Sequence, residues 1–201
     1  MKGKFIVFEG IDGAGLTTQA ELLEKHLKNK KYEVVLTKEP TNNLIGGLIR
    51  AALKKEWATS NRTLQLLFSA DRAHHLEKEI IPALDNGKIV ISDRYFISTI
   101  AYGMIELEKD WLKALNSKFL LPDIIFIIDV PVEVSIERIK GSRFGFELFE
   151  EKKKLEKIRD NFLELSKEYK NCFVINGNRS IEEIHKEIVK IVEEKLNLYL
   201  C

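Results

Sequence analysis

The stretch FIVFEGIDGAGLTT, residues 5–18, joins a short apolar run to a glycine-rich turn and then to a helical pattern. Its spacing is that of the phosphate-binding P-loop, G-x-x-x-x-G-K-S/T, which follows a strand and opens a helix. Gly10, Gly13 and Gly15 lack Cβ atoms, so the backbone can wrap around a phosphate and point its N–H groups at it. The partial positive charge at the helix N-terminus strengthens this attraction. The stretch therefore predicts a strand, a phosphate-binding loop and a helix in that order.

Leu16 stands at the position where the P-loop pattern has lysine. A lysine there reaches the β and γ phosphates and balances charge during phosphoryl transfer, which leucine cannot do. The loss of one preorganised donor typically costs about 3–4 kcal/mol, or roughly 10²–10³ in rate. We therefore expect the loop to bind phosphate through its amides and Thr17 to offer a hydroxyl to nucleotide-bound Mg²⁺, but with slower transfer.

Four further apolar runs of strand length follow along the chain, separated by longer segments with helical spacing. The runs are residues 34–36, 89–91, 124–128 and 173–175. Because they are apolar throughout, they are typical of strands in a parallel sheet covered by helices on both faces. The alternation predicts an α/β fold of three layers with a five-stranded parallel sheet. No internal repeat or low-complexity linker interrupts the 201 residues, so we expect one domain spanning residues 1–201.

The ends of several helices are marked by residues that satisfy free backbone groups. Ser60 is a candidate N-cap for a long helix through residues 64–81, and Asn86-Gly87 tolerates the left-handed conformation that ends such a helix. Ser180 with Glu183 three residues later forms a capping box before the last helical pattern.

The charge balance and the cysteines exclude several classes of protein. Lys and Arg number 32 against 31 Asp and Glu, a formal net charge of +1, which gives no reason to expect a nucleic-acid or membrane-surface partner. Cys172 and Cys201 are the two cysteines, which make neither a disulfide framework nor a zinc cluster. No apolar run reaches the roughly 18 residues of a membrane span, and the N-terminus lacks a signal-peptide pattern. We expect a cytoplasmic protein.

Residues 8–13 together with 17–19 resemble the start of the thymidylate kinases, enzymes that phosphorylate dTMP with ATP. Four further regions resemble that family in the same order along the chain: TKEPT at 37–41, LLFSADR at 66–72 with His75, DRY at 93–95 with Ser98, Ala101 and Tyr102, and LPD at 121–123 with DVP at 129–131. The resemblance implies a P-loop fold like that of the nucleoside monophosphate kinases, with a lid segment at about residues 138–150.

The resemblance also implies an acceptor site for dTMP. Phe68 would stack on the thymine ring, and the planar guanidinium of Arg72 would grip a carbonyl or phosphate. Tyr102 would lie beneath the sugar, where a 2′-hydroxyl would clash. The full set implied to bind dTMP is Asp12, Glu39, Pro40, Phe68, Arg72, Arg94, Ser98 and Tyr102.

The remaining implied roles concern ATP, the metal and the transfer itself. The residues implied to bind ATP are Gly10, Ile11, Asp12, Gly13, Ala14, Gly15, Leu16, Thr17, Thr18 and Arg138. Thr17 and Asp93 would hold Mg²⁺, and the catalytic set would be Arg94, Asp93, Asp12 and Arg143. Because Ala14 replaces the arginine that one branch of the family has in its P-loop, the lid would supply that charge through Arg143. Arg143, Arg138 or Lys38 are candidates to cover for the absent lysine.

Three functions remain open on the sequence. The first is phosphorylation of dTMP to dTDP with MgATP in dTTP biosynthesis, at a reduced rate because of Leu16. The second is a catalytically impaired nucleotide-binding paralogue, which Leu16 supports and the intact acceptor residues oppose. The third is a kinase for another nucleoside monophosphate. In each case the partners are small-molecule nucleotides, with neither nucleic acid nor membrane, and the resemblance implies a homodimer.

Overall fold

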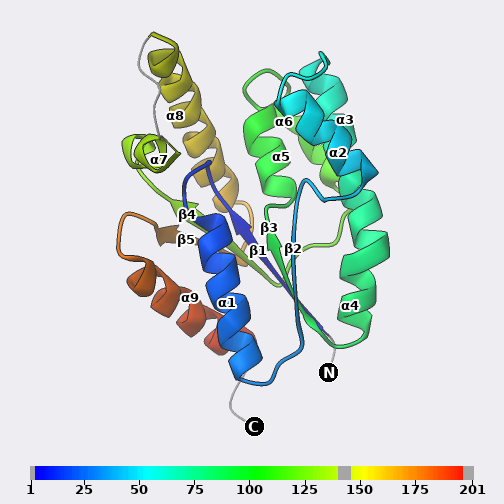
Figure 1. The fold of residues 1–201 in the computed structure, drawn as a ribbon, viewed down its shortest axis with the longest axis vertical. Helices are drawn as coiled ribbons and strands as arrows, with labels where there is room; N and C mark the ends of the chain where they lie inside the picture. The colour runs from blue at the N-terminus through cyan, green and yellow to red at the C-terminus, as the bar shows by residue number, and fades with distance from the viewer. Residues whose placement is uncertain (1–2, 140–145, 197–201) are drawn as a thin grey trace.

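Five parallel strands form a sheet at the centre of the molecule (Figure 1). The strands are β1 (Lys4–Glu9), β2 (Val34–Lys38), β3 (Ile89–Asp93), β4 (Ile124–Asp129) and β5 (Cys172–Asn176). Their order is β2-β3-β1-β4-β5, and every neighbouring pair is parallel. This computed structural model describes residues 3–139 and 146–196, with side chains described for 3–139 and 152–196. The expected five-stranded parallel sheet is confirmed.

Helices surround the sheet on both faces. They are α1 (Leu16–Asn29), α2 (Leu44–Leu53), α3 (Asn61–His75), the π-helical turn η1 (Leu76–Ile80), α4 (Ile81–Asp85), α5 (Phe96–Gly103), α6 (Lys109–Asn116), α7 (Val132–Ile139), α8 (Phe146–Ser166) and α9 (Ile181–Leu196). α1 packs on α9, whereas α4 contacts β3 and α8 contacts β4 and β5. Right-handed crossovers in this strand order place α1 on one face and α4 and α8 on the other. Among the described helices none combines the length and hydrophobicity that a bilayer span needs.

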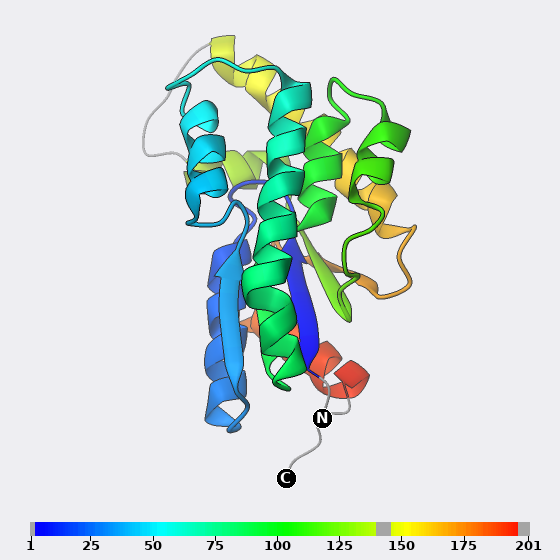
Figure 2. The ribbon, with the colours of Figure 1, turned by 90° about the vertical axis from the view of Figure 1, so that its right-hand side faces the viewer.

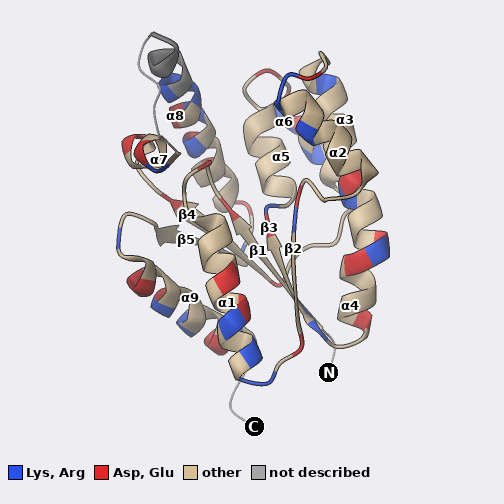
Figure 3. Cartoon of the chain, in the orientation of Figure 1, with Lys and Arg blue, Asp and Glu red and all other residues tan. Residues whose placement is uncertain are grey.

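The core lies between the sheet and the inner sides of the helices. β1, β3 and β4 are buried along most of their length, as expected for central strands covered on both faces. α5 carries no charged residue and is buried except at Tyr102, in contrast to α9, whose outer side carries both acidic and basic residues (Figure 3). α5 is therefore an internal helix, and its position places two motif residues, Ser98 and Tyr102, beside the strand ends.

Three of the expected helix ends are confirmed. Ser60 Oγ accepts a hydrogen bond from the Thr63 N–H at 3.1 Å, and Ser180 and Glu183 form the reciprocal bonds of a capping box. Gly87 has a φ of 76°, in the left-handed region that favours glycine.

The single long helix expected over residues 64–81 is not continuous. α3 ends at His75, and a π-helical turn leads into the short α4, so that the three form one column along the sheet (Figure 2). Pro82 lies in the first turn of α4. Because proline has no N–H and its ring clashes with the carbonyl four residues earlier, regular α-helical bonding cannot pass through this point.

Candidate active site

The loop after β1 has the backbone geometry of a phosphate cradle. Gly10, Gly13 and Gly15 have φ values of 150°, 76° and 96°, which other residues rarely adopt. A Cβ on Gly13 would lie 2.6 Å from the carbonyl oxygen of Ser135, so the close approach also requires glycine. α1 begins at Leu16, and the N–H groups of its first turn have no intrahelical acceptor. These groups can therefore bind phosphate oxygens.

Leu16 lies against the inside of this loop. Its side chain is 5% exposed, and its Cδ2 atom lies 3.3 Å from the point that a Cβ on Gly10 would occupy. Ile11 and Ala14 are buried beside it, whereas Asp12, Thr17 and Thr18 are partly or fully exposed. The leucine thus packs as a core residue beneath the loop.

Thr17 and Asp93 bring two oxygen atoms together at the mouth of the loop. The Thr17 hydroxyl donates to Asp93 Oδ2 at 2.5 Å, which joins the start of α1 to the end of β3. Mg²⁺ prefers hydroxyl and carboxylate oxygens in such a position next to a phosphate site. The donor set fits the metal that the sequence predicts. Both residues also line a cavity of about 370 Å³ that includes Lys38.

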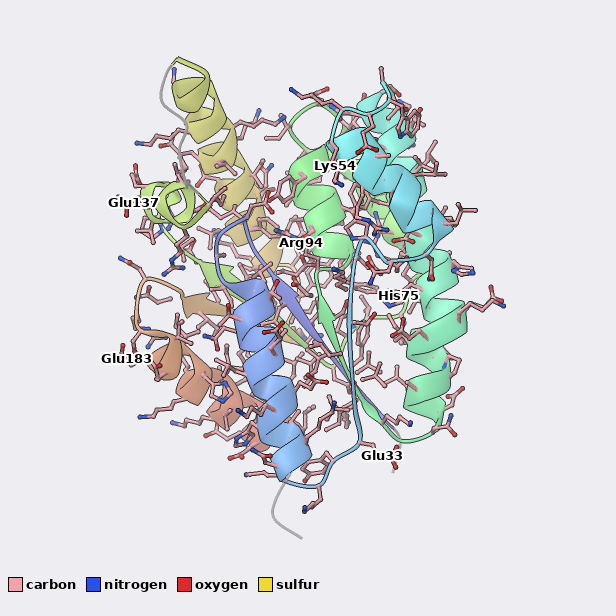
Figure 4. All side chains as sticks on the ribbon, in the orientation of Figure 1. Glu33, Lys54, His75, Arg94, Glu137 and Glu183 are labelled. Carbon is pink, nitrogen blue, oxygen red and sulfur yellow. The ribbon has the colours of Figure 1, made fainter. Side chains whose placement is uncertain are left out.

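Arg94 connects the loop to α5 (Figure 4). Its Nη1 donates to the Gly10 carbonyl at 2.8 Å and to Ser98 Oγ at 2.9 Å, and its Nη2 donates to Asp12 Oδ1 at 2.6 Å. Burial by itself would lower the pKa of Arg94, but Tyr102 and the surrounding carboxylates raise it above its ordinary value. The guanidinium therefore stays charged between the two halves of the site.

A second cavity, of about 250 Å³, lies between α3 and α5. Among the residues that line it are all eight of the predicted dTMP-binding set: Asp12, Glu39, Pro40, Phe68, Arg72, Arg94, Ser98 and Tyr102. The same wall includes residues to which the sequence analysis assigned no role, among them Gln65, Tyr95 and Thr99. The eight predicted residues come from four separate segments of the chain and thus meet in one place.

Arg72 lines this cavity. It is fully buried, and it donates from Nη1 to Asn116 Oδ1 at 2.5 Å and from Nη2 to Thr99 Oγ1 at 2.8 Å. Glu39 Oε2 lies 2.7 Å from Nη2 but off the direction of its N–H bonds, so this contact is an ion pair without an aligned hydrogen bond. The guanidinium also lies 5.0 Å from the ring centre of Tyr95. Its position is fixed from several sides.

Glu9 is a site residue for which the sequence predicted no role. Its buried carboxylate accepts the backbone N–H groups of Tyr95, Ile97 and Ser98, each at 3.1 Å, and the Ser98 hydroxyl. Burial raises its pKa to about 7, against the hydrogen bonds from Ser98, which lower it. Glu9 therefore holds the start of α5 against the end of β1. The sequence did contain a signal for this role, because an acidic residue at the end of an otherwise apolar strand is unusual.

Tyr102 and Arg138 contact the loop from its two sides. The Tyr102 hydroxyl accepts the Asp12 N–H at 3.2 Å, and burial raises the pKa of Tyr102 to about 12. Arg138 donates to the carbonyl oxygens of Gly177 at 3.1 Å and Ala14 at 3.4 Å. The remaining predicted catalytic residue, Arg143, lies outside the described residues.

The strand order and the glycine loop at the exit of β1 define a P-loop kinase of the nucleoside monophosphate class. A family model described as thymidylate kinase matches residues 8–188. A probable thymidylate kinase of Pyrococcus horikoshii is 43% identical, with 98% of each chain covered. A thymidylate kinase of Fervidobacterium nodosum is 42% identical, covering 98% of this chain and 100% of that one. The crystal structure of thymidylate kinase from Ehrlichia chaffeensis matches with a TM-score of 0.78 at 32% identity, over 96% of this chain and 100% of that one. The chain belongs to the thymidylate kinase family.

Proposed function

We propose that this enzyme transfers the γ-phosphoryl group of MgATP to dTMP, giving ADP and dTDP for dTTP biosynthesis. The observation that carries the proposal is the convergence of all eight predicted acceptor residues on one cavity next to the glycine loop. A protein that only binds ATP has no need of this second site.

The cavity offers each part of dTMP a matching group. Phe68 would present an aromatic face to the base, and Arg72 lines the same cavity with an Nε that has no described acceptor. Tyr102 and Asp12 lie near the loop, where the sugar would rest, and Arg94 faces the acceptor phosphate. The phosphate of dTMP then points toward the glycine loop and the γ-phosphate of ATP.

The chemistry asks little of the protein beyond alignment and charge neutralisation. The loop N–H groups would hold the β and γ phosphates, and Thr17 with Asp93 would hold Mg²⁺, which when bound neutralises phosphate charge. An oxygen of the dTMP phosphate attacks the γ-phosphorus as its bond to the ADP oxygen breaks. Arg94, kept charged by its neighbours, would span the acceptor phosphate and the moving phosphoryl group.

Leu16 bears on the rate and favours a second candidate function. Its burial beneath the loop leaves the phosphates without the usual lysine ammonium. We propose a reduced rate for this reason. A nucleotide-binding paralogue with impaired catalysis is the alternative that the same observation supports.

Three further proposals complete this assignment. The chain would form one domain over residues 1–201, with a lid at about 138–150 from which Arg143 would supply charge to the phosphates. The enzyme works as a homodimer, which the exposed apolar side chains Leu44, Leu48 and Leu66 on α2 and α3 would favour. Light scattering on the purified protein tests the dimer.

A coupled assay of ADP release with ATP and each nucleoside monophosphate in turn tests the function. Preferred turnover of dTMP supports the kinase. Binding of dTMP by calorimetry without turnover supports the impaired paralogue, and preferred turnover of another monophosphate refutes the assigned substrate.

A further inference from the structure

A buried chain of polar side chains runs from the nucleotide cavity to the side of β2. Arg72 Nη2 lies 2.7 Å from Glu39 Oε2, and the other oxygen of Glu39 lies 3.1 Å from Nδ1 of His75. Arg72 and His75 are 0% exposed and Glu39 is 5% exposed. Figure 4 shows His75 on α3 beside β2, away from Arg94. A buried charged group with such continuous contacts is normally held in one orientation.

The partners of His75 define which nitrogen carries the hydrogen. A carboxylate oxygen only accepts, so Nδ1 donates to Glu39. Nε2 lies 2.7 Å from the Thr37 hydroxyl, with which it shares a hydrogen bond, and 3.4 Å from Glu79 Oε2 on the π-helical turn. Both ring nitrogens are thus engaged, and the imidazole cannot rotate without losing contacts at both ends.

Of the three side chains, that of Glu39 is fixed by the fewest hydrogen bonds. Its Oε2 accepts no aligned hydrogen bond from any described residue, although it faces Arg72. Arg72 Nε likewise has no described acceptor. Both residues line the 250 Å³ cavity, so its wall contains a donor, Arg72 Nε, and an acceptor, Glu39 Oε2, that make no aligned hydrogen bond within the described residues. The bond from His75 Nδ1 is what keeps the Glu39 carboxylate turned toward Arg72.

The backbone around Glu39 has an independent anchor. Asp71 accepts hydrogen bonds from the Thr41 N–H at 2.7 Å and from the Thr41 hydroxyl at 2.6 Å. This pair ties residue 41 to α3 without help from His75. Loss of the His75 bond would therefore release the Glu39 side chain while the segment stays in place.

We propose that His75 is a positioning residue for the acceptor nucleotide: through Nδ1 it orients Glu39, and through Glu39 it orients the Arg72 guanidinium in the cavity wall. The inference rests on the proposed function, because it assigns the cavity to dTMP. It predicts a defect in the use of dTMP and none in the use of ATP.

Two substitutions at the same position separate orientation from packing. In His75→Asn the amide nitrogen takes the place of Nδ1 and keeps the donor to Glu39, whereas in His75→Gln the amide takes the place of Nε2 and that donor is lost. We expect His75→Gln to raise KM for dTMP about tenfold and His75→Asn about twofold, because a hydrogen bond to a charged group is lost in the first alone. KM for ATP should stay within about twofold in both. His74→Gln, one residue earlier on the same helix, is the matched control and should leave both KM values unchanged.

Thr37→Val is a second variant, in case the substitutions at 75 do not fold. It removes the hydroxyl that holds Nε2 at nearly constant shape, and we expect an increase of about threefold in KM for dTMP. Equal KM values for dTMP in His75→Gln and His75→Asn, or equal increases for ATP and dTMP, would overturn the proposal. Wild-type protein that neither binds nor turns over dTMP would instead refute the proposed function, so the two failures are distinguishable.

Discussion

Replacing Leu16 by lysine tests whether the missing charge limits this enzyme. The side chain starts at the first residue of α1 and lies across the inside of the glycine loop toward Gly10. A lysine is longer than leucine, so its methylene stem can cover the same apolar surface while its ammonium turns out toward the phosphates of a nucleotide bound in the loop. The exchange therefore restores the charged donor without a change in the backbone.

The structure allows the size of both effects to be worked out. Leu16 is 5% exposed, and burial of a leucine side chain is worth about 1.5–3 kcal/mol. Lysine keeps most of its methylene stem on the same surface, so we expect a loss of about 1–2 kcal/mol in the free energy of unfolding. One preorganised donor is worth about 3–4 kcal/mol in the transition state. Because this loop is packed around leucine, we expect part of that gain, an increase in kcat of more than about tenfold.

The assay is ADP release at saturating ATP and dTMP, with thermal unfolding of each variant measured beside it. KM for dTMP should change little, since the acceptor cavity is not altered. Leu16→Met is the control, because it is similar in length and uncharged, and it should give no increase in kcat. A folded Leu16→Lys protein that binds ATP and shows an unchanged or lower kcat would refute the reasoning.

Three other predictions follow from buried groups around the site. Arg72→Ala should weaken the binding of dTMP more than the binding of ATP, as measured by calorimetry. It should also lower the free energy of unfolding by about 3–5 kcal/mol, because Glu39 is left buried without its ion partner. Equal losses of affinity for both nucleotides would place Arg72 outside the acceptor site. The Glu9 carboxyl has a pKa of about 7 in the fold against an ordinary 4.5, so between these values the folded state binds more protons and stability falls as pH rises. The free energy of unfolding of the wild type, measured with urea, should fall by about 3 kcal/mol between pH 4 and 8 because of this group, and Glu9→Gln should lack that pH dependence. The same pH dependence in both proteins would assign the effect to another group. Gln65 is 4% exposed, and its Oε1 has no partner in the described part of the chain. Gln65→Met should therefore raise the free energy of unfolding by about 1 kcal/mol. A decrease would show that the Gln65 side chain is hydrogen-bonded in the folded protein.

The central strands were predictable because burial on both faces of a sheet produces one sequence pattern, a short run of apolar residues. Central parallel strands are covered on both faces, so residues 5–8 and 124–128 are apolar at every position, and the sequence places them within one residue of β1 and β4 at either end. For the edge strand β2 the apolar run in the sequence covers residues 34–36, and the strand in the structure extends two residues further, to Lys38. Ladder pairing with β3, which no local pattern reports, sets that end.

Two of the helices that the sequence analysis did not identify have local preferences that point elsewhere. α5, FISTIAYG, is rich in β-branched and aromatic residues that favour strands. It is helical because Glu9 satisfies the N–H groups at its start and the core takes up its apolar sides. α2, LIGGLIRAAL, contains Gly46 and Gly47, which lower helix propensity. A Cβ on Gly46 would lie 2.0 Å from the Thr41 carbonyl oxygen, so the first of these glycines is required by packing.

The candidate site also contains residues whose position was predictable from the sequence and residues whose position was not. The glycine loop, Glu39 and Arg94 follow the carboxyl ends of parallel strands, which meet at one edge of the sheet, so the convergence of these residues was predictable. Asn116 and Thr99, which hold Arg72, come from helices 44 and 27 residues further along the chain. Partners of this kind arise from tertiary packing alone, and no spacing in the sequence reports them.

The charge around the loop explains why Leu16 matters. Arg94 is already bound to the Gly10 carbonyl and to Asp12, and Arg138 is bound to carbonyl oxygens of Gly177 and Ala14. Part of each guanidinium is therefore already engaged, and neither is a wholly free substitute for the lysine ammonium. Lys38 forms no ion pair within the described residues, and it lines the same cavity as Thr17. An ammonium on that side approaches the metal end of the triphosphate, whereas a lysine at position 16 approaches from within the loop. The two are therefore not equivalent, and an increase in kcat with Leu16→Lys is expected even if Lys38 contributes.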